Sequence, residues 1–409
     1  MDQKNEISSY LESAALFALG ILLFLFPLFM LTATTDAYTL PKQILLGGLT
    51  FLVILIFGVK SLLRGQVIIR RTPFDIPVLI FTIIVFASSV IATNKVDAII
   101  SFVPFFFSVL AFFAIVNTAK DKSSSLILAI SLIAGGVVVS VLEVMSFLKI
   151  YVLPFAFTKF QLFNPFGSIL DQALYLAILL PLVVYLASPA LKMLRGKSSN
   201  EASSFEGGGE KGKNNSFGFA VAGVIIGIGL LASSYLLFKT PANAGGLLML
   251  PYETGFQTGF AEISQDTGRV FQGFLVGSGY GTYITDFTRF KQPAYNANTD
   301  IWSLTFFRSS SFVLELLATT GVLGVLSFAF LLYKLIRNRF VLSIMGLAVA
   351  AAVLLPFSFS MIAIFFMLLG LASAIRASSS KAHNEGFTDV ELELVALQKG
   401  LISFDATPS

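Results

Sequence analysis

The sequence predicts an all-α polytopic membrane protein with about ten transmembrane helices and one large extracytoplasmic loop. Of its 409 residues, 56% are hydrophobic and only 12% are charged. The apolar residues come in uninterrupted runs of about 18 or more, which is the length that crosses a hydrocarbon core about 30 Å thick. A transmembrane β-barrel would show short alternating segments instead.

Ten apolar runs are the candidate spans. They are Tyr10–Leu31, Ile44–Leu63, Ile76–Thr93, Ala98–Asn117, Leu126–Phe147, Leu170–Ser188, Phe217–Phe238, Phe312–Tyr333, Val341–Pro356 and Met361–Ile375. The first is too long for a signal peptide and lacks a small-residue cleavage site, so it is retained as a span. The last two are short and close together, so they form either two spans or a re-entrant hairpin.

The Lys and Arg residues indicate which way the chain crosses the membrane. Most of the 27 fall in the termini and in alternate loops, which places those loops and both termini in the cytoplasm. The domains are then 1–238, an N-terminal bundle of about seven spans; 239–308, the extracytoplasmic loop; 309–375, the C-terminal helices; and 376–409, a cytoplasmic tail. Ser198–Ser216 is predicted to be a disordered linker by composition, and Val390–Gly400 a short amphipathic helix.

Composition excludes several kinds of site. The formal charge is +4, but the basic residues are spread over loops, so no nucleic-acid partner is expected. The chain has no cysteine, and its one histidine, His383, lies in the tail. Neither a thiolate nor a histidine-cluster metal site is therefore available, and no metal or cofactor is expected.

The long loop contains a glycine-rich run, Gly277–Tyr283, in which Gly277, Gly279 and Gly281 alternate with other residues. Such a run can present backbone N–H groups to an anion such as a diphosphate. It can also be a tight turn whose glycines need positive φ, and we favour that interpretation because the Gly-x-Gly-x-Gly pattern alone is weak.

Basic and aromatic side chains in and beside the loop are candidate ligand contacts. Arg269, Arg289, Lys291 and Arg308 carry the charges that suit phosphate oxygens, and Tyr280, Tyr283 and Trp302 offer flat faces for sugar rings. The alternative is that they are surface ion pairs and interfacial belt residues. For Trp302, close to the point where the chain re-enters the membrane, the belt is at least as good an interpretation.

Three acidic residues fall at membrane depth, where charge is costly and usually has a role or a partner. Glu315 lies early in the span that follows the long loop, Glu143 lies late in the fifth span, and Asp171 opens the sixth. All three fall toward the outer side, so they predict a polar cavity just below the outer surface. The alternative is that they snorkel to the interface.

The order of these features resembles the O-antigen ligase/polymerase family of envelope proteins. That family has many spans, a large late outer loop, and a helix that enters with His, then Asn, Ser or Gln, nine residues and Gly-x-x-Gly. Here Ser310 and Ser311 precede Phe312–Thr320 and then Gly321–Gly324. The glycine run resembles the family's Gly-x-Gly-x-x-x-Phe stretch. Asn164–Ser168, followed by Leu170–Leu176 and Leu180-Pro181, resembles its glycine turn and following span.

The resemblance implies a metal-independent, inverting glycosyltransferase in the bacterial inner membrane. Its partners would be membrane lipids, a polyprenyl-diphosphate-linked glycan donor and a glycan, lipid or protein acceptor whose hydroxyl receives the glycan at the outer face. It also implies that loop arginines hold the diphosphate and that the motif histidine assists the acceptor.

This chain has Ser310 in place of the motif histidine, and a serine hydroxyl is no general base near neutral pH. Three interpretations stay open: Glu315 takes the role with Ser310 and Arg308 beside it, the acceptor needs little base, or the protein binds lipid-linked glycan without transferring it. A transporter or flippase is a further alternative. Such proteins usually show inverted repeats and broken midplane helices, and the sequence shows neither.

Overall fold

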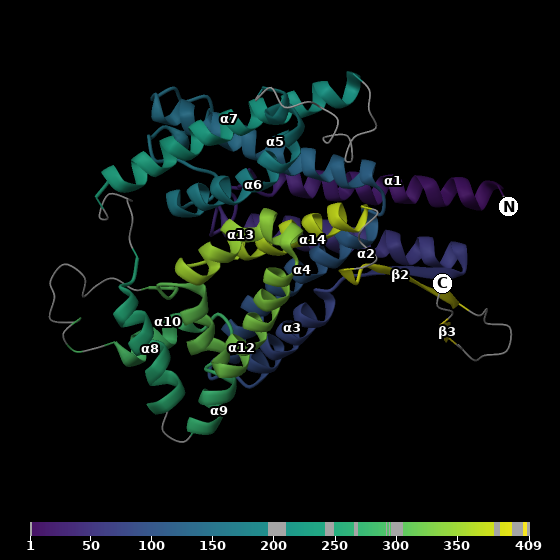
Figure 1. Ribbon diagram of the computed structural model, residues 1–409. Helices are drawn as coiled ribbons and strands as arrows, with labels where there is room; N and C mark the ends of the chain where they lie inside the picture. The colour runs from purple at the N-terminus through teal and green to yellow at the C-terminus, as the bar shows by residue number, and fades with distance from the viewer. Residues whose placement is uncertain are drawn as a thin grey trace.

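The computed structural model describes residues 2–194, 210–241, 249–265, 269–291, 293, 295, 306–379, 385–394 and 404–406. Within these residues, eight helices are long and apolar enough to cross a membrane. They are α1 (Asp2–Leu25), α2 (Thr39–Arg64), α4 (Lys95–Thr118), α5 (Lys122–Phe147), α6 (Ile169–Leu194), α7 (Glu210–Lys239), α12 (Phe312–Arg337) and α14 (Phe359–Ala377). The protein is therefore a multi-pass α-helical membrane protein (Figure 1).

The other two predicted spans are also helical but shorter. α3 (Asp75–Val90) and α13 (Arg339–Leu354) have 16 residues each, so each is about 24 Å long. Large apolar side chains cover the outside of the bundle; Phe17 is 71% exposed and Phe238 78%. An apolar surface of this kind is expected where helices contact lipid.

The core of the bundle is built around α14, which lies among the other helices in Figure 1. Every residue from Ser360 to Ile375 is buried. α14 packs closely on α4 because Gly370 has no side chain: a Cβ there would lie 3.0 Å from the carbonyl oxygen of Phe112.

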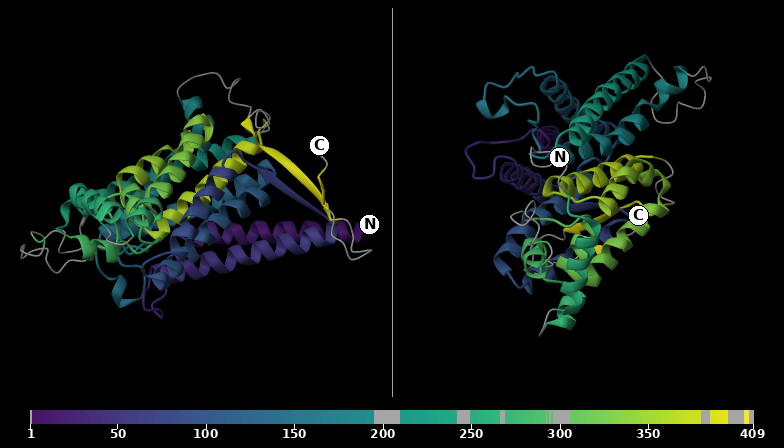
Figure 2. Two further views of the ribbon diagram at one scale, coloured as in Figure 1. Left: turned by 90° about the horizontal axis from the view of Figure 1, so that it is seen from below. Right: turned by 90° about the vertical axis from the view of Figure 1, so that its left-hand side faces the viewer.

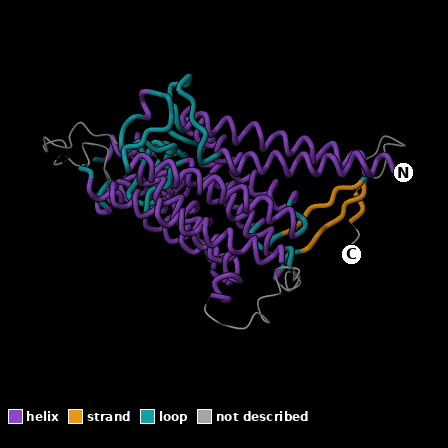
Figure 3. The backbone as a smooth tube through the Cα atoms, turned by 90° about the horizontal axis from the view of Figure 1, so that it is seen from above, coloured by secondary structure: helices purple, strands orange, loops and turns teal. Residues whose placement is uncertain are grey.

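The bundle has two different ends. At one end lie the start of α1 and a small sheet, as Figures 1 and 3 show; we call this the sheet end. At the other end lie α8 (Tyr252–Gln265) and α10 (Tyr283–Phe290), with α9 (Val270–Val276) nearby and the short helix η1 (Ala156–Thr158) on the α5–α6 connection; we call this the loop end (Figures 1 and 2).

The sheet was not predicted and corrects one expectation. β1 (Gln66–Arg71) pairs antiparallel with β2 (Thr388–Leu394), which pairs with β3 (Phe404–Ala406). The predicted helix Val390–Gly400 is therefore wrong over its first half, and residues 395–400 lie outside the described part of the chain. Val390, Leu392 and Leu394 alternate with acidic residues, which is the period of a strand rather than a helix.

The predicted linker Ser198–Ser216 is also partly wrong, because α7 begins at Glu210. Residues 195–209 lie outside the described residues. The predicted span Phe217–Phe238 covered only the apolar part of this helix, and the polar residues 210–216 before it are helical too.

α12 is interrupted at Gly321, whose φ of 64° and ψ of −165° are not helical. The break frees two carbonyl groups of the preceding turn. The Ala318 carbonyl accepts from the Ser278 N–H at 3.1 Å, and the Thr319 carbonyl accepts from the Gly279 N–H at 2.9 Å. The Ser88 hydroxyl also donates to the Thr319 carbonyl, at 2.7 Å. The expectation that no span is broken is thus wrong, and the glycine run supplies the groups that a broken helix in a membrane requires.

Candidate functional site

A cavity of about 460 Å³ opens at the loop end. Five separate parts of the chain line it: residues 36–39, 166–171, 249–250, 306–309 and 356–360. Each comes from a connection that the charge pattern assigns to the same outer side of the membrane. The alternation of spans predicted from the sequence therefore brings these connections together at one end of the bundle.

Arg308 is the basic side chain that lines this cavity. Its side chain is half-buried, and its charge interacts with the carboxylates of Asp171 and Glu315. No hydrogen bond or ion pair within 4.0 Å joins its guanidinium to another described residue. A guanidinium carries five N–H donors in a planar fork. Its donors are thus available to a ligand in the cavity.

Asp171 supplies an acid to the same cavity. It lies in the first turn of α6, and it is 6% exposed. The Ser358 hydroxyl, from the turn between α13 and α14, lies beside its carboxylate. A carboxylate at a helix N-terminus is also favoured by the helix dipole. Asp171 and Arg308 therefore place opposite charges on the wall of one cavity.

Glu315 lies near Arg308 but does not line the cavity. It is 8% exposed in the first turn of α12, with the Ser309 N–H beside its carboxylate. Its Oε2 atom has no hydrogen-bond partner among the described residues. The neighbouring Ser311 caps α12, its hydroxyl accepting from the Leu314 N–H at 3.3 Å.

Ser310, at the position of the family's histidine, is covered by protein. It is 1% exposed, and Gly255 of α8 lies directly over it: a Cβ on Gly255 would fall within 2.2 Å of the Ser310 hydroxyl oxygen. In this conformation the hydroxyl does not reach the cavity. α8 packs this closely because Gly255 has no side chain.

The glycine run is a packed turn. Gly277, Gly279 and Gly281 all have positive φ, of 69°, 125° and 82°. A Cβ on Gly277 would lie 2.5 Å from the Thr319 backbone carbon, and one on Gly279 would lie 2.3 Å from Ala92. The N–H groups at positions 277 to 279 bond to protein carbonyls, so the turn interpretation holds and these donors are not free for an anion.

The two tyrosines of this run are buried. Tyr280 is 6% exposed and its ring lies 5.1 Å from that of Phe105, and Tyr283 is fully buried. Burial raises the pKa of Tyr283 to about 12, with the hydroxyls of Ser309 and Thr258 beside its own. Both rings therefore support the turn and do not present a face to the cavity.

The remaining predicted basic residues are not part of the cavity lining. Arg269 donates to the Ile91 carbonyl at 2.6 Å and to Gln272 at 3.1 Å, so it binds the end of α3. Arg289 is exposed and lies over the Phe290 ring at 5.0 Å, and Lys291 follows the end of α10. Trp302 falls outside the described residues. The structure thus brings Arg308, but not the other three cations, to the cavity.

Glu143, the third membrane-depth acid, belongs to a different cluster. Gln172 donates to its carboxylate at 2.5 Å and also contacts Ser233 at 3.3 Å, which links α5, α6 and α7. Gln172 follows Asp171 in the chain, so the two side chains point to different faces of α6. Of the three acids predicted to share a polar cavity, Asp171 lines the loop-end cavity, Glu315 lies near Arg308 without lining it, and Glu143 lies elsewhere.

Sequence reasoning missed Lys42, which organises one side of the cavity. It is fully buried, and its ammonium donates to the carbonyls of Pro165, Phe29 and Tyr38 at 2.6, 3.1 and 3.4 Å. It therefore ties the α1–α2 connection to the segment before α6. Lysine at the start of an apolar helix was the available signal, since charge there usually has a partner.

Asp36, on the same connection, was also missed. Its carboxylate accepts from the N–H groups of Tyr38 and Thr39 at 2.8 and 2.9 Å, which fixes the turn before α2. It lines the same cavity as Arg308. The signal was an Asp three residues before a helix start, a pattern typical of a local turn.

No protein-family model matches this sequence, and a search of curated proteins gives no match. The resemblance to O-antigen ligases therefore stays a prediction that depends on the motif residues and their order.

Proposed function

We propose that the protein is a membrane glycosyltransferase of the O-antigen ligase/polymerase type. It would move a glycan from a polyprenyl-diphosphate carrier to an acceptor hydroxyl in the loop-end cavity. The observation that carries the proposal is Arg308: a half-buried guanidinium lines a cavity of about 460 Å³ and has no hydrogen bond or ion pair with another described residue. The bacterial inner membrane and cytoplasmic termini are part of the same proposal.

Arg308 would bind the diphosphate. Its planar fork suits two phosphate oxygens, and a charge-assisted hydrogen bond contributes about 1.5–3 kcal/mol. As the sugar–oxygen bond to the diphosphate breaks, negative charge grows on the leaving oxygen, and a fixed cation stabilises that charge. Glu315, whose carboxylate is buried beside Arg308, would hold the segment 308–311 in place through the Ser309 N–H.

Asp171 is the acid best placed to receive the acceptor's proton. The acceptor oxygen would attack the anomeric carbon, the bond from that carbon to the diphosphate would break with inversion, and the proton would pass to the carboxylate. Asp171 lines the cavity, whereas Ser310 is covered by Gly255 and Glu315 lies behind the wall. This choice differs from the assignment of Glu315 and Ser310 made from the motif.

A second candidate function is a non-catalytic binder of lipid-linked glycan. The observation that favours it is the burial of Ser310 at the position where the family has its histidine. A transporter is less well supported: the break in α12 lies next to the glycine run, whose N–H groups already bond to the freed carbonyls.

The test is a transfer assay with purified protein, a polyprenyl-diphosphate glycan and a panel of acceptors. We expect Arg308→Ala to weaken donor binding by about 10- to 100-fold, as the loss of about 1.5–3 kcal/mol implies. Asp171→Asn should leave donor binding intact and abolish product. Arg269→Ala, whose side chain binds the end of α3, is the matched control.

Donor binding without product in the wild type on every acceptor would favour the binder. Donor binding that is equal in the wild type and in Arg308→Ala would contradict both functions, because neither then uses the cavity.

A further inference from the structure

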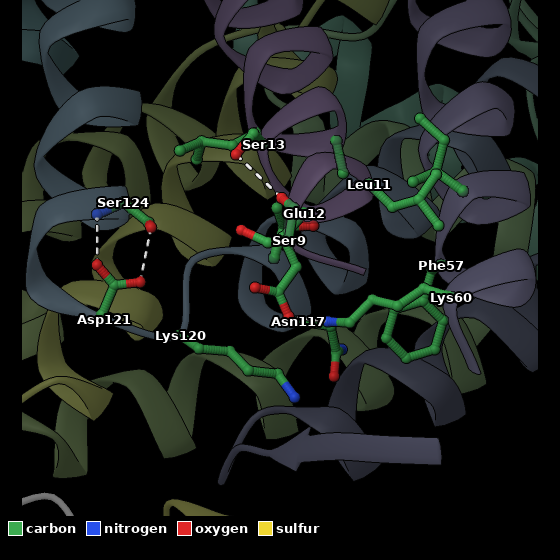
Figure 4. Close-up of a pocket in the computed structure, with 14 residues that line it drawn as sticks. Ser9, Leu11, Glu12, Ser13, Phe57, Lys60, Asn117, Lys120, Asp121 and Ser124 are labelled. Carbon is green, nitrogen blue, oxygen red and sulfur yellow. Dashed lines mark hydrogen bonds and ion pairs between the residues drawn. The ribbon is translucent and has the colours of Figure 1, made fainter. Parts of the chain in front are cut away.

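A second polar pocket lies at the sheet end, far along the bundle from the loop-end cavity. Its volume is about 180 Å³, and it is formed by α1, α2, the end of α4 and the start of α5. Figure 4 shows Glu12, Lys60, Asn117 and Lys120 gathered around it. We call it the sheet-end pocket.

The charges of this pocket leave one cation without full compensation. Glu12 accepts from Lys60 at 2.5 Å and from Arg64 at 3.1 Å, so two cations share one carboxylate. Asp121 is occupied by the N–H and hydroxyl of Ser124, at 3.1 and 2.7 Å. Arg64 lies outside the pocket lining but shares Glu12, so Lys60, Lys120 and Arg64 together face the carboxylates of Glu12 and Asp121, a net charge of one positive unit. Arg70 and Asp389, which also act on Lys120, cancel each other.

Lys120 provides the donors that a ligand would use. Its ammonium donates to the Ile68 carbonyl at 3.0 Å, and this is its one hydrogen bond among the described residues, so two of its three N–H bonds remain. Burial, and next the charge of Lys60, lower the pKa of Lys120 to about 8. Burial and the neighbouring charge therefore disfavour the protonated form of Lys120, and a bound anion would stabilise it.

An apolar cavity adjoins the sheet-end pocket. Its volume is about 280 Å³, it lies between α2, α4 and β1, and Phe57, Asn117 and Thr118 line both spaces. Apart from Asn117 and Thr118 its wall is apolar, including Val53, Leu110 and Ala114. A polar pocket beside an apolar one is the arrangement that an amphiphile requires.

The location fits the edge of a bilayer. The pocket lies where α1, α2 and α4 meet the charged connections. Exposed apolar residues lie nearby along the helices that line it: Tyr10 of α1 is 73% exposed and Leu62 of α2 is 76%. Basic pockets between transmembrane helices, on the side rich in Lys and Arg, are suited to anionic lipid headgroups.

We propose that the sheet-end pocket binds an anionic phospholipid of the phosphatidylglycerol type. Its single phosphodiester lies between Lys60 and Lys120, and one acyl chain enters the apolar cavity between α2 and α4. One phosphodiester carries one negative charge, which matches the one uncompensated cation. A zwitterionic phosphatidylethanolamine brings a second cation and matches less well. The inference is independent of the transfer reaction.

The test uses full-length protein purified in a non-ionic detergent and stripped of lipid. Phosphatidylglycerol and phosphatidylethanolamine are added in turn, and retained lipid is counted by native mass spectrometry. We expect one phosphatidylglycerol per chain, and about tenfold weaker binding in Lys120→Gln, as one charge-assisted hydrogen bond implies. Lys120→Arg should retain binding. Lys122→Gln, two residues away and outside the pocket lining, is the matched control and should not change it.

A second variant separates the lipid from a free anion. Ala114→Leu fills the apolar cavity, so it should weaken the binding of phosphatidylglycerol but not the binding of inorganic phosphate at the sheet-end pocket. Gel filtration and thermal unfolding check that the variant is folded. Equal binding of both phospholipids, equal binding by Lys120→Gln, or phosphate binding without phosphatidylglycerol binding would each overturn the proposal.

Discussion

Two arginines at opposite ends of the bundle show how differently one side chain is used. At the sheet end, Arg70 donates to Asp389 at 3.0 Å and to the carbonyls of Ala119 and Lys120 at 3.2 and 2.9 Å. At the loop end, Arg308 lines a cavity and makes no such bond to a described residue. The first guanidinium holds the tail strand and the α4–α5 connection together.

The contrast extends to the two ends as a whole. At the sheet end, the ion pairs and hydrogen bonds join chain segments, such as Arg376 to Glu385 and Lys60 to Glu12. At the loop end, backbone groups, Lys42 and Arg269 join the segments, whereas Arg308 lines the cavity without such a bond to a described residue. A structural cation such as Arg70 and the cation proposed to bind a ligand, Arg308, thus differ in their partners and not in residue type.

The largest expected effect is on the backbone contacts of the loop end. Gly277→Val should lower the free energy of unfolding by about 3 kcal/mol or more, because φ is positive there and the new Cβ meets the Thr319 backbone, which cannot move aside. Thermal unfolding in detergent measures it. Gly58→Ala is the control: nothing lies within 4 Å of that site in α2, and stability should stay the same or rise by up to about 1 kcal/mol.

Next in size is the loss of the sheet-end arginine. Arg70→Ala should destabilise the protein by about 3 kcal/mol, since it leaves two carbonyl groups and the Asp389 carboxylate without their donor. Arg71→Ala, on the exposed side of the same strand, should change stability by less than about 0.5 kcal/mol. Equal effects from the two variants would contradict a structural role for Arg70.

At Arg308 we expect the opposite pattern of effects. Arg308→Lys keeps the charge but loses the planar fork, so donor affinity should fall about tenfold while the unfolding temperature stays the same. Calorimetric titration with a polyprenyl-diphosphate glycan measures the affinity. A drop in unfolding temperature as large as that of Arg70→Ala would make Arg308 a structural residue.

The smallest effect concerns pH. The hydrogen bond from Arg376, with a further one from Asn338 at 3.1 Å, lowers the pKa of Glu385 below its usual 4.5. Because the folded state binds this proton less tightly than the unfolded state, the contribution is complete above pH 4.5 and is lost as the pH falls through the lower, folded pKa. Glu385→Gln should therefore flatten the acid limb of the stability curve slightly. An unchanged acid limb would contradict this role.

The fold was predictable because a long apolar segment in a membrane can satisfy its backbone hydrogen bonds only as a helix or in a closed barrel. Each of the ten apolar runs overlaps a helix, and eight of those helices are long enough to span. The alternation of spans also placed Arg308 and Asp171 at one end. The strand at Thr388–Leu394 had a local signal in its alternating apolar and acidic residues, but its partner, Gln66–Arg71, lies more than 300 residues away and could not be predicted from the sequence.

The site was less predictable because it depends on packing between distant segments. The motif frame pointed to Ser310, but whether its hydroxyl is open or covered is decided by Gly255 on another helix. The glycine run was recognisable as a turn. Its second role, donating N–H groups to the carbonyls freed by the break in α12, depends on how Gly321 packs beside it. Lys42 was missed because its partners at Phe29 and Pro165 are backbone carbonyls, which carry no sequence signature.

Lys42 also has a consequence for how the protein is made. Its shortest hydrogen bond crosses 123 positions of the chain to Pro165. At a synthesis rate of roughly 5–20 residues per second, the ribosome needs about 6–25 s to deliver that carbonyl after Lys42 itself has emerged. For that interval the first two helices carry a buried amine whose best acceptor has not yet been translated. Water, lipid headgroups or the insertion machinery must hydrogen-bond to the Lys42 ammonium until the segment before the sixth helix has been translated.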